Sequence, residues 1–435
     1  MKRIIVLLTM VGVLGALSAC SEPEPSTSAS STAGDDARGA ACADLDLLAC
    51  ARLGTLADLV PAQATAATGE PIRLGMVNQE NTPVGSFPEL SAAVQAAATF
   101  VNEQLGGVGG RPIQVEVCNT NFSAEGSTAC GQQFAEAGVP AVLGGIDIFG
   151  NAVDVLNTNA IPFVGGIPVS TQSVTAPNSF QWSGGTWGAA VAFADWAATR
   201  LNAKSISIVY GEFGSIADSA GYGRTVLESR GVATQMVPYP IITTDLTSPL
   251  TAAMSTNPEA LVVLAADTGC KAAFDGVRTL GITVPVFYVG ACASPAIVSS
   301  VPPEATEGAL FNVEGQVSTS NPDPDFALYA EVLETYGDGL NPVGASTVSF
   351  RAFMNLYAVL SGLDTDVTAS SVTSALAAQR DTPSFMGHPY TCDRQQFEGL
   401  PAMCSPQQIM VEMRNREVVQ VSDWIDVGAI YAASL

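Results

Sequence analysis

The chain has 435 residues, 47% of them hydrophobic, with 17 Lys and Arg against 41 Asp and Glu, a formal net charge of −24. A chain of this length buries a large core and should divide into two or more lobes. The acidic balance argues against a nucleic-acid backbone as partner, which would need clustered cations. It is typical of a solvated extracytoplasmic surface, and a preference for cationic ligands stays open as an alternative.

Residues 1–19 have the pattern of a secretion signal. Lys2 and Arg3 precede an apolar run over residues 4–14, which is too short to span a membrane, and small residues follow. The sequence Leu17-Ser18-Ala19-Cys20 resembles a bacterial lipobox, in which the cysteine becomes the lipidated first residue of the mature protein. We therefore expect a lipoprotein anchored to the cell membrane at Cys20, with an ordinary signal peptide as the alternative.

Two segments separate this signal from the main body. Residues 20–40 are rich in Ser, Thr, Ala, Pro and acidic residues without an apolar period, which predicts a flexible tether. Apolar residues return in residues 41–69, where we expect one or two short helices joined by a disulfide between Cys42 and Cys50. This small appendage should dock on the main body.

The stretch from Pro71 to Val117 predicts a βαβ unit. An apolar strand (72–77) leads into a polar loop, a helix over about 89–105, a cluster of glycines and a second strand (113–117). The two strands should be parallel, with a right-handed crossover. Because ligands sit beyond the carboxyl ends of parallel strands, the loop 78–87 is the first candidate for a binding site.

Strands and helices alternate along the rest of the chain, which favours an α/β fold. The final segment, residues 408–421, predicts a hairpin near a sheet edge that turns at Asn415-Arg416. Further strands are predicted at 139–144, 161–164, 205–210, 232–237, 260–265 and 284–289, and helices at 184–201, 246–254, 271–280, 321–336 and 345–362.

The run IRLGMV, the helix ending FVNEQLGGVGGRPIQVEV and the cysteine after it resemble the opening of type I periplasmic solute-binding proteins. The branched-chain amino acid and amide binders of ABC importers are the most similar branch. The resemblance implies two lobes, each a mainly parallel sheet flanked by helices, joined by three inter-lobe crossings. We expect lobe 1 to hold 70–183 plus 313–405, and lobe 2 to hold 184–312 plus 406–435.

Nine cysteines are present, and setting Cys20 aside leaves an even number, which favours disulfides in an exported protein. Sequence alone leaves about 105 pairings open. Nearest-neighbour pairing, one plausible solution, joins Cys42 to Cys50, Cys118 to Cys130, Cys270 to Cys292 and Cys392 to Cys404.

The sequence offers no pattern for catalysis. The chain has a single histidine, His388, no GxSxG motif and no GxxxxGK[ST] loop. No CxxC pair occurs, and no Cys and His residues stand at zinc spacing. We therefore expect a protein that is not an enzyme and has no metal or cofactor.

A binding protein needs a cleft with a few convergent polar groups and an apolar wall. Loops at the predicted strand ends supply such residues, and two of them match residues of the similar family: Phe87, where that family often has an aromatic residue, and Tyr222 of its Tyr-Gly pair. The ligand-binding candidates are Glu80, Phe87, Asp147, Phe149, Ser170, Thr171, Tyr222, Asp267 and Thr268.

Two departures from the similar family bear on the ligand. Amino-acid binders of that family hold the ligand carboxylate with hydroxyl groups, but the matching loop here, residues 146–149, has none. Their acidic residue for the ligand ammonium is also missing from residues 289–292, although Asp267 is a possible substitute. An amino-acid ligand is therefore in doubt, while the architecture is unaffected.

We expect a monomeric, lipid-anchored substrate-binding protein of an ABC importer, which docks to the permease subunits and captures an amino acid, amide or related acid. Closure of the lobes around the ligand would couple affinity to the hinge equilibrium. The alternative is a ligand-sensing or scaffolding lipoprotein with the same fold and no role in transport.

Overall fold

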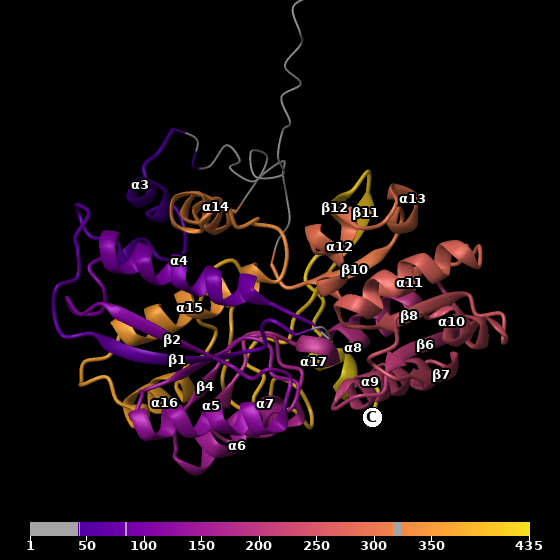
Figure 1. Cartoon of the computed structure of the whole chain (residues 1–435), viewed down its shortest axis with the longest axis horizontal. Helices are drawn as coiled ribbons and strands as arrows, with labels where there is room; N and C mark the ends of the chain where they lie inside the picture. The colour runs from indigo at the N-terminus through magenta and orange to yellow at the C-terminus, as the bar shows by residue number, and fades with distance from the viewer. Residues whose placement is uncertain (1–41, 43, 83–84, 316–322) are drawn as a thin grey trace, which may run out of the picture.

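A computed structural model describes residues 42, 44–82, 85–315 and 323–435. The predicted signal sequence, Cys20 and the tether lie outside these residues. The described chain forms two halves, each built on its own sheet, as Figure 1 shows. The α/β fold predicted from the sequence is confirmed.

The first sheet is entirely parallel, with strand order β2-β1-β3-β4-β5. Its strands are β1 (Ile72–Asn78), β2 (Ile113–Asn119), β3 (Val142–Gly144), β4 (Phe163–Val164) and β5 (Ser179–Phe180). Neighbouring residues of β1 pack in different hydrophobic clusters: Met76 belongs to one cluster and Val77 to the other. Both faces of this sheet are therefore covered, as a parallel sheet requires.

Helices from two distant parts of the chain cover these faces. The helices are α4 (Pro88–Gln104), α5 (Ala124–Ala137), α6 (Asn151–Thr158), α7 (Thr171–Thr175), α14 (Pro324–Tyr336), α15 (Ser346–Ser361) and α16 (Ala369–Ala377). Local sequence sets the bounds of α5: the Ser123 hydroxyl accepts the Gly126 N–H at its start, and Gly138 ends it at φ 61°. In Figure 1, α4, α14 and α15 lie on the side of the sheet opposite to α5 and α6.

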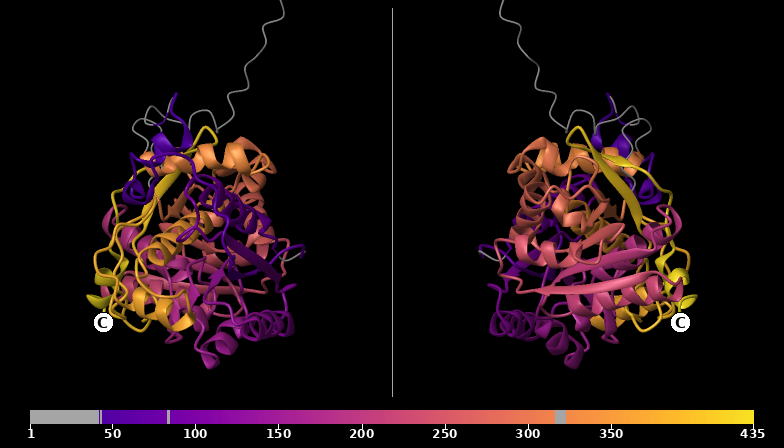
Figure 2. Two further views of the ribbon diagram at one scale, coloured as in Figure 1. Left: turned by 90° about the vertical axis from the view of Figure 1, so that its left-hand side faces the viewer. Right: turned by 90° about the vertical axis from the view of Figure 1, so that its right-hand side faces the viewer.

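The second sheet has strand order β12-β11-β10-β9-β8-β6-β7. Its strands are β6 (Ser205–Gly211), β7 (Ala233–Tyr239), β8 (Ala260–Leu264), β9 (Val286–Tyr288), β10 (Leu310–Val313), β11 (Ile409–Arg414) and β12 (Glu417–Gln420). The first five are parallel, and β11 is antiparallel to both of its neighbours. The predicted C-terminal hairpin is thus confirmed at the sheet edge, where it is yellow in Figure 2.

The helices of the second half are α8 (Gly185–Thr199), α9 (Ile216–Ser229), α10 (Thr247–Met254), α11 (Asp267–Thr279), α12 (Pro295–Ser299), α13 (Pro303–Thr306) and α17 (Val427–Ala432), with a 3-10 turn η2 at Gly290–Ala293. The sequence prediction missed α7, α12, α13, α16 and α17 and began α11 four residues too late. Helix α7 has only five residues, too few for a hydrophobic period to be visible in the sequence.

The chain passes between the halves three times. It leaves β5 for α8 through residues 181–184, leaves β10 for α14 after Val313, and returns to β11 through residues 404–408. Gly185 follows the first crossing at φ 54°, and a Cβ there would lie 2.2 Å from the carbonyl oxygen of Pro168. The crossings are therefore tightly packed.

The predicted appendage contains α3 (Leu47–Ala51) and the 3-10 turn η1 (Ala57–Leu59). Thr55 anchors it: its backbone N–H and hydroxyl donate to the two carboxylate oxygens of Asp325 at 2.9 and 2.7 Å. Asp325 lies in the first turn of α14 and is 2% exposed. The appendage is thus bonded to the helix beside which it lies in Figure 1.

The structure contains four disulfides, Cys42–Cys50, Cys118–Cys130, Cys270–Cys292 and Cys392–Cys404, which are the nearest-neighbour pairs. Within the described residues, no helix combines the length and the apolar character that a bilayer span demands. Nor do three or more His, Cys, Asp or Glu side chains gather there in a way that would suit a metal ion.

Candidate functional site

A cavity of about 200 Å³ lies where the carboxyl ends of both sheets meet. Residues that directly follow β1, β3 and β4 line it from the first half, and residues after β7, β8 and β9 line it from the second. Carboxyl ends of parallel strands are the usual place for a ligand in such sheets. The cavity is therefore the candidate binding site.

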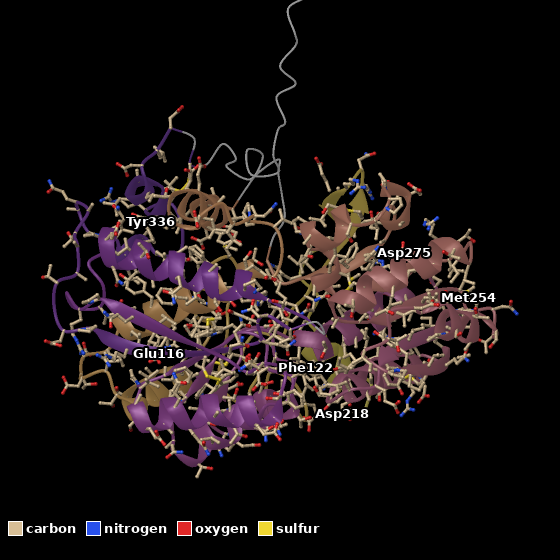
Figure 3. All side chains as sticks on the ribbon, in the orientation of Figure 1. Glu116, Phe122, Asp218, Met254, Asp275 and Tyr336 are labelled. Carbon is tan, nitrogen blue, oxygen red and sulfur yellow. A yellow bond between two sulfur atoms is a disulfide. The ribbon has the colours of Figure 1, made fainter. Side chains whose placement is uncertain are left out.

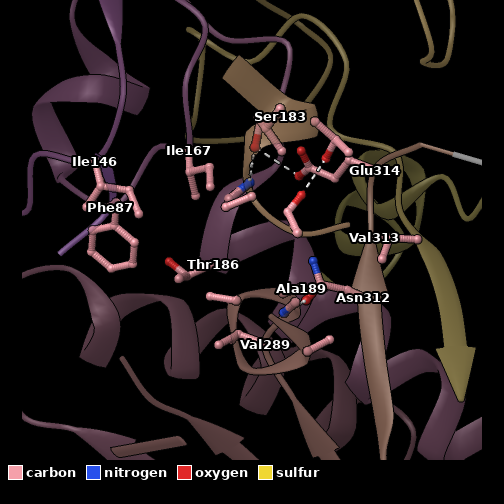
Figure 4. Close-up of a pocket in the computed structure, with 18 of the residues that line it drawn as sticks. Phe87, Ile146, Ile167, Ser183, Thr186, Ala189, Val289, Asn312, Val313 and Glu314 are labelled. Carbon is pink, nitrogen blue, oxygen red and sulfur yellow. Dashed lines mark hydrogen bonds between the residues drawn. The ribbon is translucent and has the colours of Figure 1, made fainter. Parts of the chain in front are cut away.

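The wall from the first half is apolar. Ile146 and Ile148 follow β3, Ile167 and Val169 follow β4, and Phe87 precedes α4. Figure 4 shows Phe87, Ile146 and Ile167 side by side on one wall of the cavity. Ile146 and Phe87 are only 5% and 6% exposed, whereas Ile148, Ile167 and Val169 are half-buried.

The wall from the second half is also apolar. It is formed by Ile216 at the start of α9, Ile241 after β7, Ala265 after β8, and Val289 with Ala293 around η2. Val289 and Ala189 lie on the wall opposite to Phe87 in Figure 4. A guest between these walls contacts hydrocarbon from both halves.

A polar cluster closes one end of the cavity at the three crossings. Glu314, which is 9% exposed, accepts hydrogen bonds at Oε1 from the Ser183 hydroxyl (2.9 Å), the Gly184 N–H (2.9 Å) and Gln408 Nε2 (2.8 Å). Ser183 and Gly184 belong to the first crossing, Glu314 to the second and Gln408 to the third. Figure 4 shows Ser183 and Glu314 together at this end, joined by a dashed line. One carboxylate thus binds all three crossings.

Arg351 of α15 neutralises Glu314. Its Nη2 lies 2.9 Å from Glu314 Oε2 and also donates to the Trp182 carbonyl at 3.0 Å, while its Nη1 donates to the Glu314 carbonyl. Arg351 is 4% exposed. Because every oxygen of Glu314 already accepts a hydrogen bond, this carboxylate has little capacity left for a ligand cation.

The remaining polar side chains in the wall are nearly all satisfied by protein groups. The Thr186 hydroxyl lies 2.7 Å from that of Ser219, and Thr347 donates to the Gly344 carbonyl at 2.8 Å. Asn312 accepts the Gly290 N–H at 2.8 Å and donates to Gln408 Oε1 at 2.8 Å. Each of these groups thus has a protein partner, while the hydroxyls keep free acceptor positions and Asn312 Nδ2 a second N–H.

Gln79 is the exception. It follows β1, lines the cavity and is 2% exposed. Its Nε2 donates to the Gly85 carbonyl at 2.9 Å, but its enclosed Oε1 has no hydrogen-bond partner among the described residues. A buried amide oxygen without a partner is uncommon, because it loses the hydrogen bonds that water would provide.

Of the nine ligand-binding candidates from the sequence, the structure places Phe87 in the cavity wall. Phe149 lies nearby, in a cluster with Phe122, which lines the cavity, and Phe213. The ring centroids are 5.4–5.7 Å apart. Phe122 and Phe149 come from the first half and Phe213 from the second, and Figure 3 shows Phe122 where the halves meet.

The carboxylates of Glu80 and Asp147 accept hydrogen bonds from other residues of the first half. Glu80 Oε1 accepts hydrogen bonds from Ser91 (2.5 Å) and Asn78 (3.0 Å). Asp147 accepts the Ser127 hydroxyl at 2.6 Å. Burial raises the pKa of the Asp147 carboxyl, and hydrogen bonds from Ser127 and from the Gly150 and Phe149 N–H groups oppose this rise. Neither side chain lines the cavity.

Ser170, Thr171, Tyr222 and Thr268 do not line the cavity, and the side chain of Asp267 lies outside the described part of the structure. Ser170 is the N-cap of α7 and Thr171 is that helix's first residue, while Tyr222 stacks on Tyr431 with ring centroids 4.3 Å apart. Asp267 is the first residue of α11 and Thr268 the second, directly after the lining residue Ala266.

The fold is that of a two-lobed binding protein, with a cavity between its two sheets. Residues 71–401 match the family model described as periplasmic binding protein, so the chain belongs to that family. The family consists of solute-binding proteins of ABC transporters and not of enzymes. None of the curated protein sequences compared with the chain matches it significantly.

Solved structures share the fold at low sequence identity. A fatty acid ABC transporter substrate-binding protein from Thermomonospora curvata has a TM-score of 0.73 and 15% identity over 86% of this chain and 97% of its own. The branched-chain amino acid binding protein LivJ from Streptococcus pneumoniae, in complex with isoleucine, gives 0.68 and 14% over 81% and 100%. A solute-binding protein from R. palustris in complex with 4-hydroxybenzoate gives 0.67 and 14% over 82% and 97%.

Proposed function

We propose that this protein is the lipid-anchored, extracytoplasmic substrate-binding component of an ABC importer and that it captures a small organic solute between its lobes. The observation that carries the proposal is the cavity, which is built from strand ends of both halves at the point where three chain crossings meet. Ligand contacts with both halves would favour the closed arrangement over an open one. We propose the lobe bounds expected from the sequence, 70–183 plus 313–405 for lobe 1 and 184–312 plus 406–435 for lobe 2.

The family and the similar structures support this role. Neighbours of the same fold are named for substrates as different as a fatty acid, isoleucine and 4-hydroxybenzoate. The fold therefore accommodates many small ligands, and the cavity lining decides among them.

Ligand capture is tested by thermal unfolding of the purified chain with a panel of amino acids, amides, aromatic acids and neutral aromatic compounds. At a hundredfold excess over its Kd, one ligand should stabilise the protein by about 2.7 kcal/mol, which raises Tm by a few degrees. A panel without any stabilising compound would contradict the proposal.

Anchoring and transport need separate tests. Wild-type protein should fractionate with membranes, and Cys20→Ser should release it to the soluble fraction. Protein extracted from membranes with its ligand should carry an ABC permease and ATPase, identified by mass spectrometry. Ligand binding without these subunits would favour the sensing or scaffolding alternative.

A further inference from the structure

Phe122 contacts both halves of the protein and lines the cavity between them. We propose, building on the function above, that Phe122 is a positioning residue, which couples occupation of the cavity to closure of the two halves through its contact with Phe213. A ligand would then gain affinity because this ring holds the second half against the first, in addition to any contact that it makes with the ring itself.

The ring of Phe122 belongs both to the cavity wall and to a contact between the halves. Phe122 follows β2 and is half-buried, and its ring centroid lies 5.5 Å from that of Phe149 and 5.7 Å from that of Phe213. Among these three described rings, Phe122 alone lines the cavity. Figure 3 shows it where the halves meet. A molecule in the cavity can therefore touch a ring that in turn touches the second half.

The segment that carries Phe213 is itself held against the first half. Phe213 follows β6, and two residues later the Ser215 hydroxyl donates a hydrogen bond to the Val169 carbonyl. Ser215 is 3% exposed, and Val169 lines the cavity after β4. The ring contact and this hydrogen bond both lie outside the three crossings, so separation of the halves would break them.

The backbone at Phe122 is strained. Asn121 and Phe122 have φ angles of 51° and 52°, in the left-handed region, which is unfavourable for a residue with a Cβ and rare for a large side chain. Such conformations persist where the surrounding structure enforces them, and they are frequent at ligand-binding sites. The strain thus favours a role of this ring in binding over a role in packing alone.

The strained turn is fixed at its start by a hydrogen-bonded pair and a disulfide. Asn119 accepts the Glu80 N–H at Oδ1 (3.0 Å) and donates from Nδ2 to the Glu80 carbonyl (2.9 Å). The Cys118–Cys130 disulfide joins the end of β2 to α5. The ring is therefore presented to the second half from a turn that has little freedom to move.

A double-mutant cycle on ligand affinity tests the coupling. Isoleucine, benzamide, 4-hydroxybenzoate and 4-methylphenol represent the four classes of the panel above, and the panel compound that binds the full chain most tightly in calorimetry is the probe. Phe122→Ala and Phe213→Ala should each weaken probe binding on the order of tenfold. The double variant should bind about 2- to 13-fold more tightly than the product of the two single effects predicts, because both substitutions remove the same ring contact.

Tyr431→Ala is the control, because that ring is stacked on Tyr222 within the second half. Combined with Phe122→Ala, it should give a Kd within about twofold of the product of the single effects. A simple product for Phe122→Ala with Phe213→Ala, or a coupling seen in Tm but not in Kd, would overturn the inference and leave the proposed function standing. Failure of the whole panel would overturn both.

A second variant separates the ring from the strained backbone. Glycine adopts positive φ angles without a steric penalty, so Phe122→Gly removes the ring and relieves the turn. Its Kd for the probe should agree with that of Phe122→Ala to within about twofold. Wild-type affinity in Phe122→Gly would show that the loss in Phe122→Ala arises from the backbone and not from the missing ring, and would overturn the proposal.

Discussion

Arg351 Nη2 lies 2.9 Å from Glu314 Oε2, and both side chains are almost fully enclosed at the junction of the three crossings. The pair connects α15 of the first half to the segment that follows β10 of the second. Since Glu314 also accepts hydrogen bonds from Ser183 and Gln408, this pair holds the three crossings together where the two halves join.

Removal of the cation should therefore be costly. Arg351→Met leaves the Glu314 carboxylate buried without a counter-charge, and we expect a loss of about 3–5 kcal/mol in the free energy of unfolding. Urea denaturation followed by circular dichroism measures this loss.

The exposed pair of Lys271 and Asp275, 3.1 Å apart on α11, is the matched control. Lys271→Met should change stability by about 0.5 kcal/mol or less. The double variant Arg351→Met with Glu314→Gln should recover part of the loss, because no charge is then left unpaired. Equal effects of Arg351→Met and Lys271→Met would contradict the role given to the buried pair.

Asp325 makes the docking of the appendage sensitive to pH. Burial raises the pKa of its carboxyl, against hydrogen bonds from Thr55 and the Met386 N–H. Because the folded pKa lies above the unfolded value of about 3.9, the native state binds more protons between these two values. The stability from this effect is present below about pH 3.9 and is lost as pH rises through the folded pKa.

Asp325→Asn removes the titratable carboxyl. Any other effect of this substitution on the free energy of unfolding does not depend on pH. We expect wild type to lose stability relative to the variant as pH rises through the folded pKa, measured by urea denaturation at a series of pH values. A constant difference between the two proteins across the series would contradict this assignment.

The sequence predicted the architecture well because hydrophobic periodicity and glycine stops are local signals. The strand at 72–77 and the hairpin turn at Asn415-Arg416 agree with β1 and with the turn between β11 and β12. The Glu314–Arg351 pair joins residues 37 positions apart. Such a contact leaves no periodic signal in the sequence.

The cavity lining was less predictable for a specific reason. Polar side chains are the usual sign of a binding loop in a sequence, and they point to Asp147 and Ser170 in the loops after β3 and β4. The structure lines the cavity with their apolar neighbours Ile146, Ile148 and Val169. The missing hydroxyl in residues 146–149, which was noted as a departure from amino-acid binders, was the available signal for an apolar site.

The Cys270–Cys292 disulfide joins α11 to η2, whose residues Gly290, Ala291 and Ala293 line the cavity. The double replacement by Ala should cost about 3 kcal/mol in stability by the chain-entropy estimate. It should also weaken binding of the ligand found by thermal unfolding, because η2 then loses its covalent attachment. Calorimetry and urea denaturation measure the two effects.

The Cys42–Cys50 disulfide is the control for that prediction, because it lies in the appendage and away from the cavity lining. Its double replacement by Ala should lower stability while the affinity for the same ligand stays within about twofold. Equal losses of affinity in both double variants would show that the effect does not arise from η2.

The contact of Phe213 with Phe122 and Phe149 joins the two halves beside the cavity, with ring centroids 5.7 and 5.4 Å apart. Aromatic pairs of this kind contribute about 0.5–1.5 kcal/mol each beyond their buried area. Phe213→Ala should therefore favour an open arrangement and weaken binding of the ligand found by thermal unfolding on the order of tenfold. Calorimetry measures the affinity, and small-angle X-ray scattering of the ligand-free protein should show a larger radius of gyration.

The stack of Tyr431 on Tyr222 joins α17 to α9 within the second half and provides the comparison. Tyr431→Ala removes a similar amount of aromatic contact without touching the junction between the halves. It should lower Tm but leave the radius of gyration and the affinity for that ligand unchanged. If Phe213→Ala also left both quantities unchanged, the contacts among the three phenylalanine rings would have no influence on closure of the two halves.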